Sequence, residues 1–490
     1  MSEPRFLHLG GLRDVEAFQR HLQELQISIP CDPELVAGDA SPLAQPLRRG
    51  NIRLGNRFAI HPMEGWDGTV DGRPTELTFR RWRRFGASGA KLIWGGEAVA
   101  VCHEGRANPN QLAIGPHAIA DLSRLREALV EEHRRTVGSI VDLMIGLQLT
   151  HSGRYSRPNI HDRPEPRILY RHPLLDKRLG IDDDHPILTD GEIRQIIESF
   201  HRAARVAHDA GFDFVDIKHC HGYLGHEFLS AHTRGGDYGG SFENRTRFLR
   251  EVVTGVRAVA PSLTVGVRLS AFDTVPFRPD SKRSLPGKPG PGEPEPFSTL
   301  LPYRWGFGVN IQNPIAPDLS EPAQFLALLG ELGITLVNIS AGSPYYNPHL
   351  QRPALYPPSD GYLPPEEPLQ AVAQQMQVTR TLKKQFPHLI IVGSAYTCLQ
   401  DFLPHVAQAA VREGWVDCVG LGRMVLAYPT LPLDVISGRG VQRKQVCRTF
   451  SDCTSAPRAG LPSGCYPLDP HYKESEDAAV LKRLKRRRTD

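Results

Sequence analysis

Short apolar runs recur along the chain from residue 57 and alternate with longer stretches of helical pattern. The runs are almost continuously hydrophobic, which is typical of strands buried on both faces of a parallel sheet. Eight of them occur, at residues 57–60, 90–94, 143–149, 212–217, 263–269, 336–339, 389–392 and 418–421. Helices are predicted between them, for example over 192–210 and 242–259. Thr189 and Glu192 at the start of the first of these helices form a capping signal. Eight strand–helix units predict an α/β fold of the TIM (β/α)8 barrel type, and a doubly wound open sheet is the alternative.

The rest of the chain is arranged around this pattern. Residues 1–50 form an N-terminal extension with an amphipathic helix over 14–22, residues 51–440 form the barrel, and residues 441–490 form a cysteine-containing segment with a short basic tail. Two long stretches, 156–184 and 273–318, follow the third and fifth predicted strands. Loops at the carboxyl ends of barrel strands lie over the mouth, so we expect lids or binding loops there. Surface decoration without a role is the alternative.

Composition and charge exclude several classes of protein. The 490 residues are 40% hydrophobic and 23% charged, with a formal net charge of +4, which is ordinary for a globular protein and gives no sign of nucleic-acid binding. The basic run 482–488 is expected to be a solvated, disordered tail, with an anionic partner as the alternative. No apolar stretch approaches the roughly 20 residues of a membrane span, and the first residues lack a signal pattern. Eight cysteines in this length do not form a disulfide framework, so we expect a cytoplasmic protein.

Ionisable side chains gather directly after the fourth predicted strand, 212–217. They are Lys218, His219, His221 and Tyr223. An α/β barrel presents its chemistry at such strand ends. Farther along, residues 238–245 read Tyr-Gly-Gly-Ser-Phe-Glu-Asn-Arg. Together these segments resemble the Old Yellow Enzyme family of flavin-dependent oxidoreductases, and the second segment is long enough to be a specific signal.

The resemblance implies catalytic roles for three of these side chains. Tyr223 matches the family's general acid, which protonates one carbon of an activated alkene while the flavin delivers hydride to the other. His221 matches one member of the pair that binds the substrate carbonyl oxygen and stabilises its developing negative charge. Lys218 stands where the family usually has histidine, and a lysine can also bind a carboxylate. We therefore expect the same chemistry with a different substrate preference, and we expect His219 and Cys220 to pack behind the site.

The other strand ends resemble the family's flavin cradle. Arg268 lies inside an apolar run, and a buried guanidinium needs an acceptor, either in an ion pair or, as in the family, at the N1 and O2 edge of the flavin. Glycines that end the seventh and eighth strands, together with Arg423, resemble the phosphate site of such barrels, and a single phosphate site implies FMN. Glu64 is unusual, because the family often has a small residue or cysteine there. The implied cofactor-binding residues are Pro62, Met63, Glu64, Ala98, Gln148, Arg268, Gly393, Ser394, Gly422 and Arg423.

Three cysteines follow the barrel, at Cys447, Cys453 and Cys465. In larger relatives, the 2,4-dienoyl-CoA reductases and trimethylamine dehydrogenase, four cysteines in this frame hold a [4Fe–4S] cluster. Phe450 stands at the second ligand position, and such clusters are normally held by four thiolates, so we expect no iron–sulfur cluster. Those relatives also continue into nucleotide-binding domains, for which this chain is too short. We therefore expect electrons to enter and leave at the same barrel mouth.

The expected function is FMN-dependent oxidation of NAD(P)H coupled to reduction of an enone-like alkene or a similar small-molecule acceptor. An amine dehydrogenase or demethylase of the same fold, which oxidises its substrate, is the first alternative. A flavin-binding module without catalysis is the second. The third is a metal-dependent barrel hydrolase built on His219 and His221, but the other strand ends offer few further ligands, so we predict no metal site. We expect no membrane or nucleic-acid partner, and an oligomer is compatible with the sequence.

Overall fold

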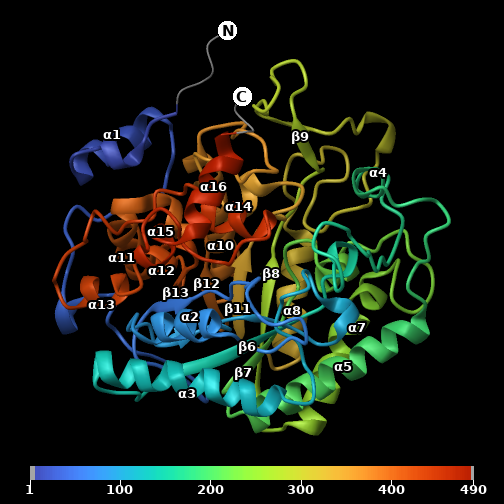
Figure 1. Cartoon of the computed structure of the whole chain (residues 1–490), viewed down its shortest axis with the longest axis horizontal. Helices are drawn as coiled ribbons and strands as arrows, with labels where there is room; N and C mark the ends of the chain where they lie inside the picture. Colours follow the sequence, from blue (N-terminus) through green and yellow to red (C-terminus); the bar gives the residue numbers. More distant parts are fainter. Residues whose placement is uncertain (1–5, 487–490) are drawn as a thin grey trace.

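The computed structural model describes residues 6–486, and at its centre is a closed barrel of parallel strands (Figure 1). The barrel strands are β3 (Phe58–Ile60), β4 (Leu92–Ile93), β6 (Met144–Thr150), β7 (Phe214–Ile217), β8 (Thr264–Ser270), β11 (Leu336–Ser340), β12 (Ile390–Gly393) and β13 (Cys418–Leu421). Each strand pairs in parallel with the next, and the pairing of β13 with β3 closes the ring. Every predicted apolar run overlaps one of these strands. The TIM barrel prediction is confirmed, and the open-sheet alternative is wrong.

The amino-terminal end of the barrel is closed by an antiparallel hairpin of β1 (Leu47–Arg49) and β2 (Ile52–Leu54). Apolar side chains at the first positions of several barrel strands form one buried cluster with Leu47, Ile52 and Leu54 of the hairpin. Close packing of such branched and aromatic side chains makes the interior a solid core rather than a pore. The open end of the barrel is therefore the opposite one, where the strands finish.

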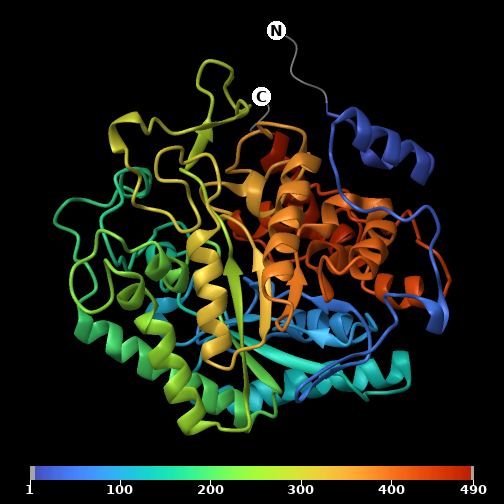
Figure 2. The same ribbon diagram turned by 180° about the vertical axis from the view of Figure 1, so that it is seen from behind.

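Helices cover the outside of the barrel (Figures 1 and 2). The longer ones are α2 (Glu76–Gly86), α3 (Ala118–Val137), α5 (Asp190–Asp209), α7 (Phe242–Val259), α8 (Ser320–Glu331), α10 (Pro368–Gln385) and α11 (Leu403–Arg412). The shorter ones are α4 (Leu175–Leu179), α6 (Leu224–Leu229), α9 (Pro348–Gln351), α12 (Arg423–Ala427) and α13 (Leu431–Ile436). The predicted cap of α5 is confirmed: Glu192 N donates to Thr189 Oγ1 at 3.2 Å, and Thr189 N donates to Glu192 Oε2 at 2.8 Å.

The second predicted strand is interrupted. β4 ends at Ile93, and β5 (Ala98–Ala100) continues after a break at residues 94–97 and pairs with the end of β6. Gly96 has a φ of +50°, and a Cβ there would lie 2.8 Å from the Trp82 ring, so the break requires glycine. The carboxylate of Glu97, inside the break, is buried and pairs with Arg81 Nη2 at 2.9 Å.

The N-terminal extension packs on the outer layer. The predicted helix is α1 (Val15–Glu24), and Asp14 caps it by accepting a hydrogen bond from Ala17 N at 2.8 Å. The Phe18 ring stacks on Phe402 with ring centres 4.4 Å apart. Phe402 ends the 3₁₀ helix η6 (Tyr396–Phe402), which follows β12. The extension therefore shares the apolar packing of the barrel.

Both long stretches after the third and fifth predicted strands contact the segments around the barrel mouth. The first contains α4, and the second contains a hairpin of β9 (Phe277–Pro279) and β10 (Gly292–Pro294). In Figure 1, α4 and β9 lie at the upper right. His161 Nε2, in the first stretch, lies 2.8 Å from Pro457 O, and Phe277 N, in the second, donates to Tyr346 O at 2.8 Å.

The C-terminal segment folds as α14 (Asp452–Arg458), α15 (Pro470–Lys473) and α16 (Glu476–Arg486). The basic run, predicted as a disordered tail, is helical through residue 486, so that prediction is wrong for this part. Leu481 provides the anchor, because it is buried with Ala456 and Tyr472, and Lys485 pairs with Asp452. Arg487 and Arg488 lie outside the described residues. Within residues 6–486, no helix combines the length and hydrophobicity that crossing a bilayer requires.

Candidate active site

One cavity opens at the carboxyl ends of the barrel strands, and every predicted site residue except Gly393 lines it. The lining residues among those predicted are Pro62, Met63, Glu64, Ala98, Gln148, Lys218, His221, Tyr223, Arg268, Ser394, Gly422 and Arg423. Gly393 lies behind the lining at the end of β12, where a Cβ would be 2.8 Å from Val416 Cγ1. Parallel strands finish at one edge of a barrel, so side chains distant in the sequence meet there.

Tyr223 is held between a carboxylate and a second phenol. Its hydroxyl donates to Glu64 Oε2 at 2.8 Å and lies 2.8 Å from the Tyr345 hydroxyl. Trp66 Nε1 donates to the other oxygen of Glu64 at 3.2 Å. Burial and then the charge of Glu64 raise the pKa of Tyr223 well above 10. The tyrosine is therefore protonated at neutral pH, and the unusual Glu64 has a defined partner within the cavity.

His221 and Lys218 accompany Tyr223 at the end of β7. His221 Nε2 lies 2.9 Å from Ser340 Oγ. Burial and then the charge of Arg268 hold the pKa of His221 well below 6.5, so the imidazole is neutral. Lys218 Nζ lies 3.7 Å from the centre of the Tyr223 ring, a cation–π contact. Burial lowers the pKa of Lys218, and the charge of Glu64 opposes that effect.

A buried carboxylate organises the part of the cavity formed by β6, β7 and β8. Asp216 Oδ2 accepts from Trp94 Nε1 at 2.7 Å and from Gln148 Nε2 at 2.5 Å, and Asp216 Oδ1 accepts from Arg268 N at 2.7 Å. Burial raises the pKa of Asp216 to about 6 despite these bonds. The Arg268 guanidinium has no hydrogen-bond or ion-pair partner among the described residues, and burial lowers its pKa. The ion-pair alternative for Arg268 therefore finds no partner there, and the group is available to a ligand.

Unpartnered donors mark a second part of the cavity, around β12 and β13. Arg423 Nη2 donates to Pro353 O at 3.0 Å, whereas Arg423 Nη1 is buried without a partner. A Cβ on Gly422 would meet nothing within 4 Å, so the backbone is open to a ligand. Ser394 Oγ donates to Ile339 O at 2.6 Å. A guanidinium beside accessible backbone fits a phosphate group, and Arg268 fits the electron-rich edge of a ring in the same cavity.

Sequence reasoning missed several residues of the lining: His61, Trp66, Tyr345, Gln351, Arg352, Cys453 and Arg458. His61 directly follows β3, so its place at a strand end was a usable signal. Asp216 was equally visible as a carboxylate inside an apolar run. Arg352, at the end of α9, and Arg458, at the end of α14, had no such signal, because only the tertiary fold brings these helices to the mouth.

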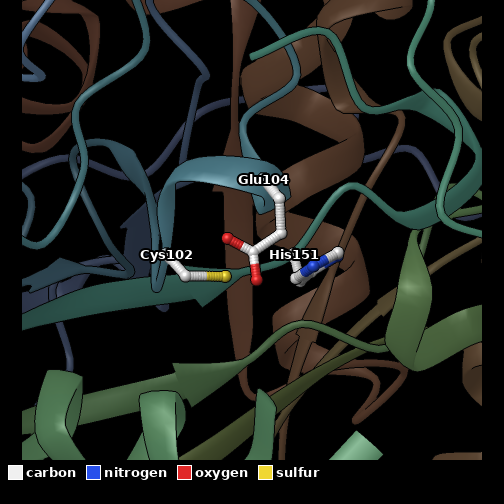
Figure 3. Close-up of side chains that lie close together, drawn as sticks. All are labelled: Cys102, Glu104 and His151. Atoms are coloured by element: carbon white, nitrogen blue, oxygen red, sulfur yellow. The ribbon is translucent and has the colours of Figure 1, made fainter. Parts of the chain in front are cut away.

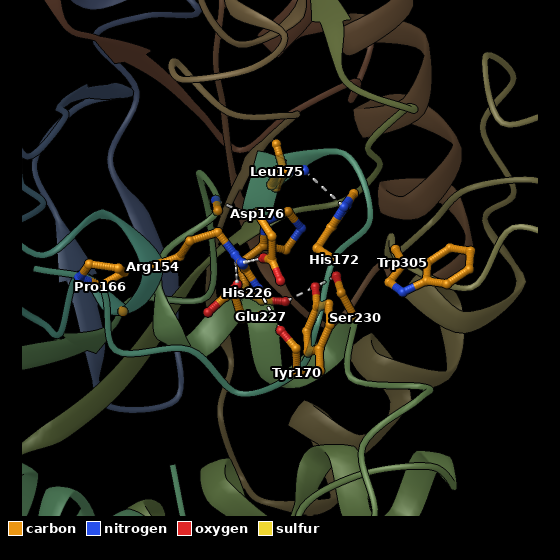
Figure 4. Close-up of polar contacts among 12 residues, drawn as sticks. Arg154, Pro166, Tyr170, His172, Leu175, Asp176, His226, Glu227, Ser230 and Trp305 are labelled. Atoms are coloured by element: carbon orange, nitrogen blue, oxygen red, sulfur yellow. Dashed lines mark hydrogen bonds and ion pairs between the residues drawn. The ribbon is translucent and has the colours of Figure 1, made fainter. Parts of the chain in front are cut away.

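A buried ion network surrounds Arg154 (Figure 4). Arg154, whose side chain is 0% exposed, donates from Nε to Glu227 Oε1 at 2.6 Å, from Nη2 to Tyr170 O at 2.8 Å, and pairs with Asp176. Asp176 lies in α4 and Glu227 in α6. Tyr223 is the residue that precedes the first turn of α6, so the network anchors the helix that begins directly after Tyr223.

His219 packs behind the site as predicted, with ring centres 5.8 Å from Phe325 and 6.0 Å from Phe248. Burial lowers its pKa from 6.5 to about 4. An unfolded histidine takes up a proton below pH 6.5 and the folded one does not, so this contribution to stability is full above pH 6.5 and is lost as the pH falls toward 4. One pKa unit corresponds to about 1.4 kcal/mol.

Urea unfolding of wild type and His219→Gln at pH 7 and 5.5 measures that contribution. Other buried groups, such as Asp216, shift stability in the opposite direction, so the informative quantity is the difference between the two proteins. We expect the difference in the free energy of unfolding to move by about 1.4 kcal/mol in favour of the variant at pH 5.5. An unchanged difference would show that His219 is protonated in the folded protein.

The three C-terminal cysteines lie near one another. Burial and then the charges of Cys447 and Cys453 raise the pKa of Cys465 to about 12, and Cys453 lines the cavity. Phe450, at the second ligand position of that frame, packs against Tyr356 with ring centres 5.4 Å apart. That no iron–sulfur cluster forms stays a prediction.

Within residues 6–486, one group of side chains has metal-ligating atoms within 4.8 Å of one another: Cys102, Glu104 and His151 (Figure 3). None of them lines the cavity. Gly153 N donates to His151 Nδ1 at 3.1 Å, so the neutral ring has its proton on Nε2 and offers no free lone pair. This group therefore gives no support to a metal-dependent hydrolase at the mouth.

The fold and the cavity define a class of protein: an α/β barrel whose mouth brings guanidinium groups, a phenol and a neutral imidazole together in one cavity. Residues 42–281 match the model of the NADH:flavin oxidoreductase / NADH oxidase family. Over these residues, just under half of its length, the chain is similar to this family, that of Old Yellow Enzyme.

Two curated relatives illustrate the similarity. An NADPH dehydrogenase of Geobacillus sp. (strain WCH70) is 33% identical over 244 residues, which are 48% of this chain and 64% of the relative. The 12-oxophytodienoate reductase 1 of Oryza sativa subsp. japonica is 31% identical over 247 residues, which are 49% of this chain and 61% of the relative. The matched region thus spans less than two thirds of either relative.

Solved structures share the fold. An Old Yellow Enzyme homologue from Zymomonas mobilis superposes with a TM-score of 0.53 at 22% identity, over 83% of this chain and 96% of the homologue. Histamine dehydrogenase from Rhizobium sp. 4-9 superposes with a TM-score of 0.62 at 20% identity, over 88% of this chain and 53% of that protein.

Proposed function

We propose that this chain is an FMN-dependent oxidoreductase that takes hydride from NAD(P)H and reduces an activated alkene. The observation that carries the proposal is the convergence of Tyr223, His221, Arg268 and Arg423 on one cavity. The family model and relatives named for NADPH oxidation and oxophytodienoate reduction support it. FAD carries two phosphate groups and FMN carries one. The cavity offers one region in which open backbone lies beside a guanidinium, at Gly422 and Arg423, and this favours FMN.

The residues present fit FMN. Arg423, Gly422 and Ser394 would hold the phosphate, Arg268 and Gln148 the pyrimidine side of the ring, and Pro62, Met63 and Ala98 the remaining edge. When bound, the flavin supplies reversible hydride transfer. Arg268, which has no anionic partner in the described part of the chain, favours negative charge at its own end of the ring.

Tyr223 and His221 have different roles toward the substrate: one donates a proton and the other binds the carbonyl oxygen. His221 is neutral, so it donates one N–H to the carbonyl oxygen and stabilises developing negative charge there without a formal charge of its own. Tyr223 keeps its proton at neutral pH and gives it to the carbon that becomes basic. Tyr345 lies 2.8 Å from the Tyr223 oxygen and can return a proton to it.

One contact favours the reverse direction as a second candidate. The Tyr223 proton already points to Glu64 Oε2, and a carboxylate in that position suits removal of a proton from a substrate. A flavin-dependent amine dehydrogenase or demethylase would use this pair as a base. The choice between the two directions rests on which substrate exchanges electrons with the flavin.

The proposal is tested with the purified protein under anaerobic conditions. We expect a flavin absorbance spectrum, release of FMN on acid treatment, bleaching by NADPH or NADH, and recovery of the colour on addition of an enone. Bleaching by an amine and not by NAD(P)H would favour the second candidate. A protein that is colourless and takes up no FMN would refute both.

A further inference from the structure

Three guanidinium groups follow one wall of the cavity, and they do not all serve the cofactor. They belong to Arg423, Arg352 and Arg458. The charge of Arg423 acts on Arg352, and that of Arg352 acts on Arg458. After burial, the largest cause, these like charges help to lower the pKa of Arg352 to about 10 and of Arg458 to about 9. Hydrogen bonds give the same order along the wall: Arg423 Nη2 donates to Pro353 O, next to Arg352, and Arg352 Nη1 donates to Thr454 Oγ1, one turn before Arg458 in α14.

Arg352 and Arg423 lack an anionic partner within residues 6–486. Arg352 donates from Nη1 to Thr454 Oγ1 at 2.5 Å, while its Nε and Nη2 are buried without partners. Arg458 pairs with Asp360, but the Asp360 side chain is 55% exposed, so water screens the ion pair. Buried guanidinium donors without acceptors are costly, so the wall is complete only when an anion lies against it.

The FMN phosphate accounts for the Arg423 end of the wall and not for the other end. Besides burial and Arg352, the groups that act on the pKa of Arg458 are Tyr345, Arg157 and Tyr223. Arg458 is thus placed with the phenols that face the substrate. The phosphate region is built around Gly422 and Ser394, on the tips of β13 and β12.

The carboxylate in this part of the cavity, that of Glu64, is engaged by other groups: it accepts from the Tyr223 hydroxyl at 2.8 Å and from Trp66 Nε1 at 3.2 Å. Its charge also acts on the pKa of Lys218, Tyr223 and Tyr345, and no ion pair joins Glu64 to Arg352 or Arg458 within residues 6–486. Lys218 therefore has its counter-charge in Glu64 and its cation–π contact with Tyr223. Near the phenols, Arg352 has no anionic partner within residues 6–486, and the partner of Arg458 is the solvent-exposed Asp360.

We propose that the substrate carries an oxyanion, a carboxylate or a phosphate, that binds Arg352 and Arg458 while its reacting atoms lie against Tyr223 and His221. Planar guanidinium groups bind such oxyanions through paired hydrogen bonds. This inference rests on the proposed function and names the substrate class of the same site. It also places the determinant of substrate preference at these arginines rather than at Lys218.

Matched acceptors test the proposal on the flavin-loaded enzyme: the meta and para carboxylates of benzalacetone and their methyl esters. We expect at least one acid to have a KM about 10- to 100-fold below that of its ester. Arg458→Gln should remove this preference by raising the KM of the acid and leaving that of the ester unchanged. Equal KM values for both acids and their esters in wild type would overturn the proposal.

Two variants separate the sources of the anion and the effect of bulk charge. Arg157→Gln removes the same charge close to Arg458 from a residue that does not line the cavity, and it should keep the acid preference. FMN release from Arg352→Gln and Arg458→Gln is followed by flavin fluorescence. If Arg458→Gln loses FMN and keeps the preference for the acid, the wall belongs to the cofactor phosphate and the proposal is wrong.

Failure of the proposed function gives a different result. If no enone is turned over, binding of each acid and ester is measured by calorimetry on the same protein. Tighter binding of the acid that disappears in Arg458→Gln supports the anion site without ene reduction. Equal binding of acid and ester removes the anion site whatever the reaction.

Discussion

Tyr223→Phe is expected to slow alkene reduction by about 10²- to 10⁴-fold, the range usual for loss of a general acid. Phenylalanine keeps the ring under Lys218 Nζ and removes the hydroxyl that lies between Glu64 and Tyr345. The oxidation of NAD(P)H needs no proton from this hydroxyl, so its rate should change by less than about threefold. Stopped-flow absorbance of the flavin measures the two half-reactions separately.

Tyr155→Phe is the matched control. The Tyr155 ring stacks on Tyr345 with centres 4.0 Å apart, but its hydroxyl has no hydrogen-bond partner among the described residues, and it does not line the cavity. We expect both half-reactions of this variant to stay within about threefold of wild type. If Tyr223→Phe slows both half-reactions equally, its effect is on the shape of the cavity and the acid must be sought elsewhere, first at Tyr345.

The sequence predicted the barrel because its strands are buried on both faces and therefore read as continuous apolar runs. The same logic predicted Arg268, since a charge inside such a run has few structural uses, and would have predicted Asp216 as well. The break at Gly96 was not predictable, because it depends on the Trp82 ring of α2 lying over the chain. Local pattern thus predicts which strands exist, whereas interruptions depend on what packs against them.

In the candidate site, too, some residues could be predicted from local sequence pattern and others could not. Residues at strand ends were found because every parallel strand of a barrel ends at one mouth, so position in the sequence implies position in space. Tyr345, Arg352 and Arg458 come from loops and short helices, and no periodicity indicates where these lie. The side chain of Glu64 was singled out as unusual, yet its partner, Tyr223, is 159 residues away in the sequence. Side chains at strand tips were therefore predictable, and those that loops and short helices bring to the cavity were not.

Arg154→Met is expected to lower the free energy of unfolding by about 3–5 kcal/mol, the usual cost of removing one partner from a buried ion pair. The change leaves Glu227 and Asp176 without their counter-charge in a place that water does not reach. Burial already raises the pKa of Glu227, and Arg154 is what opposes that shift. Urea unfolding at pH 7 measures the loss.

Two further variants distinguish the stranded charge from lost packing. Arg171→Met removes an arginine that lies 3.5 Å from the same Asp176. The Arg171 side chain is 30% exposed, so the free energy of unfolding should fall by less than about 1 kcal/mol. Arg154→Met combined with Glu227→Gln should recover part of the loss, because the amide tolerates burial better than the carboxylate does. If the double variant is no more stable than Arg154→Met alone, the network acts through shape rather than charge. Loss of Arg154 should also displace α6, whether the network acts through charge or through shape. A folded Arg154→Met protein should therefore reduce alkenes more slowly, because Tyr223 directly precedes α6.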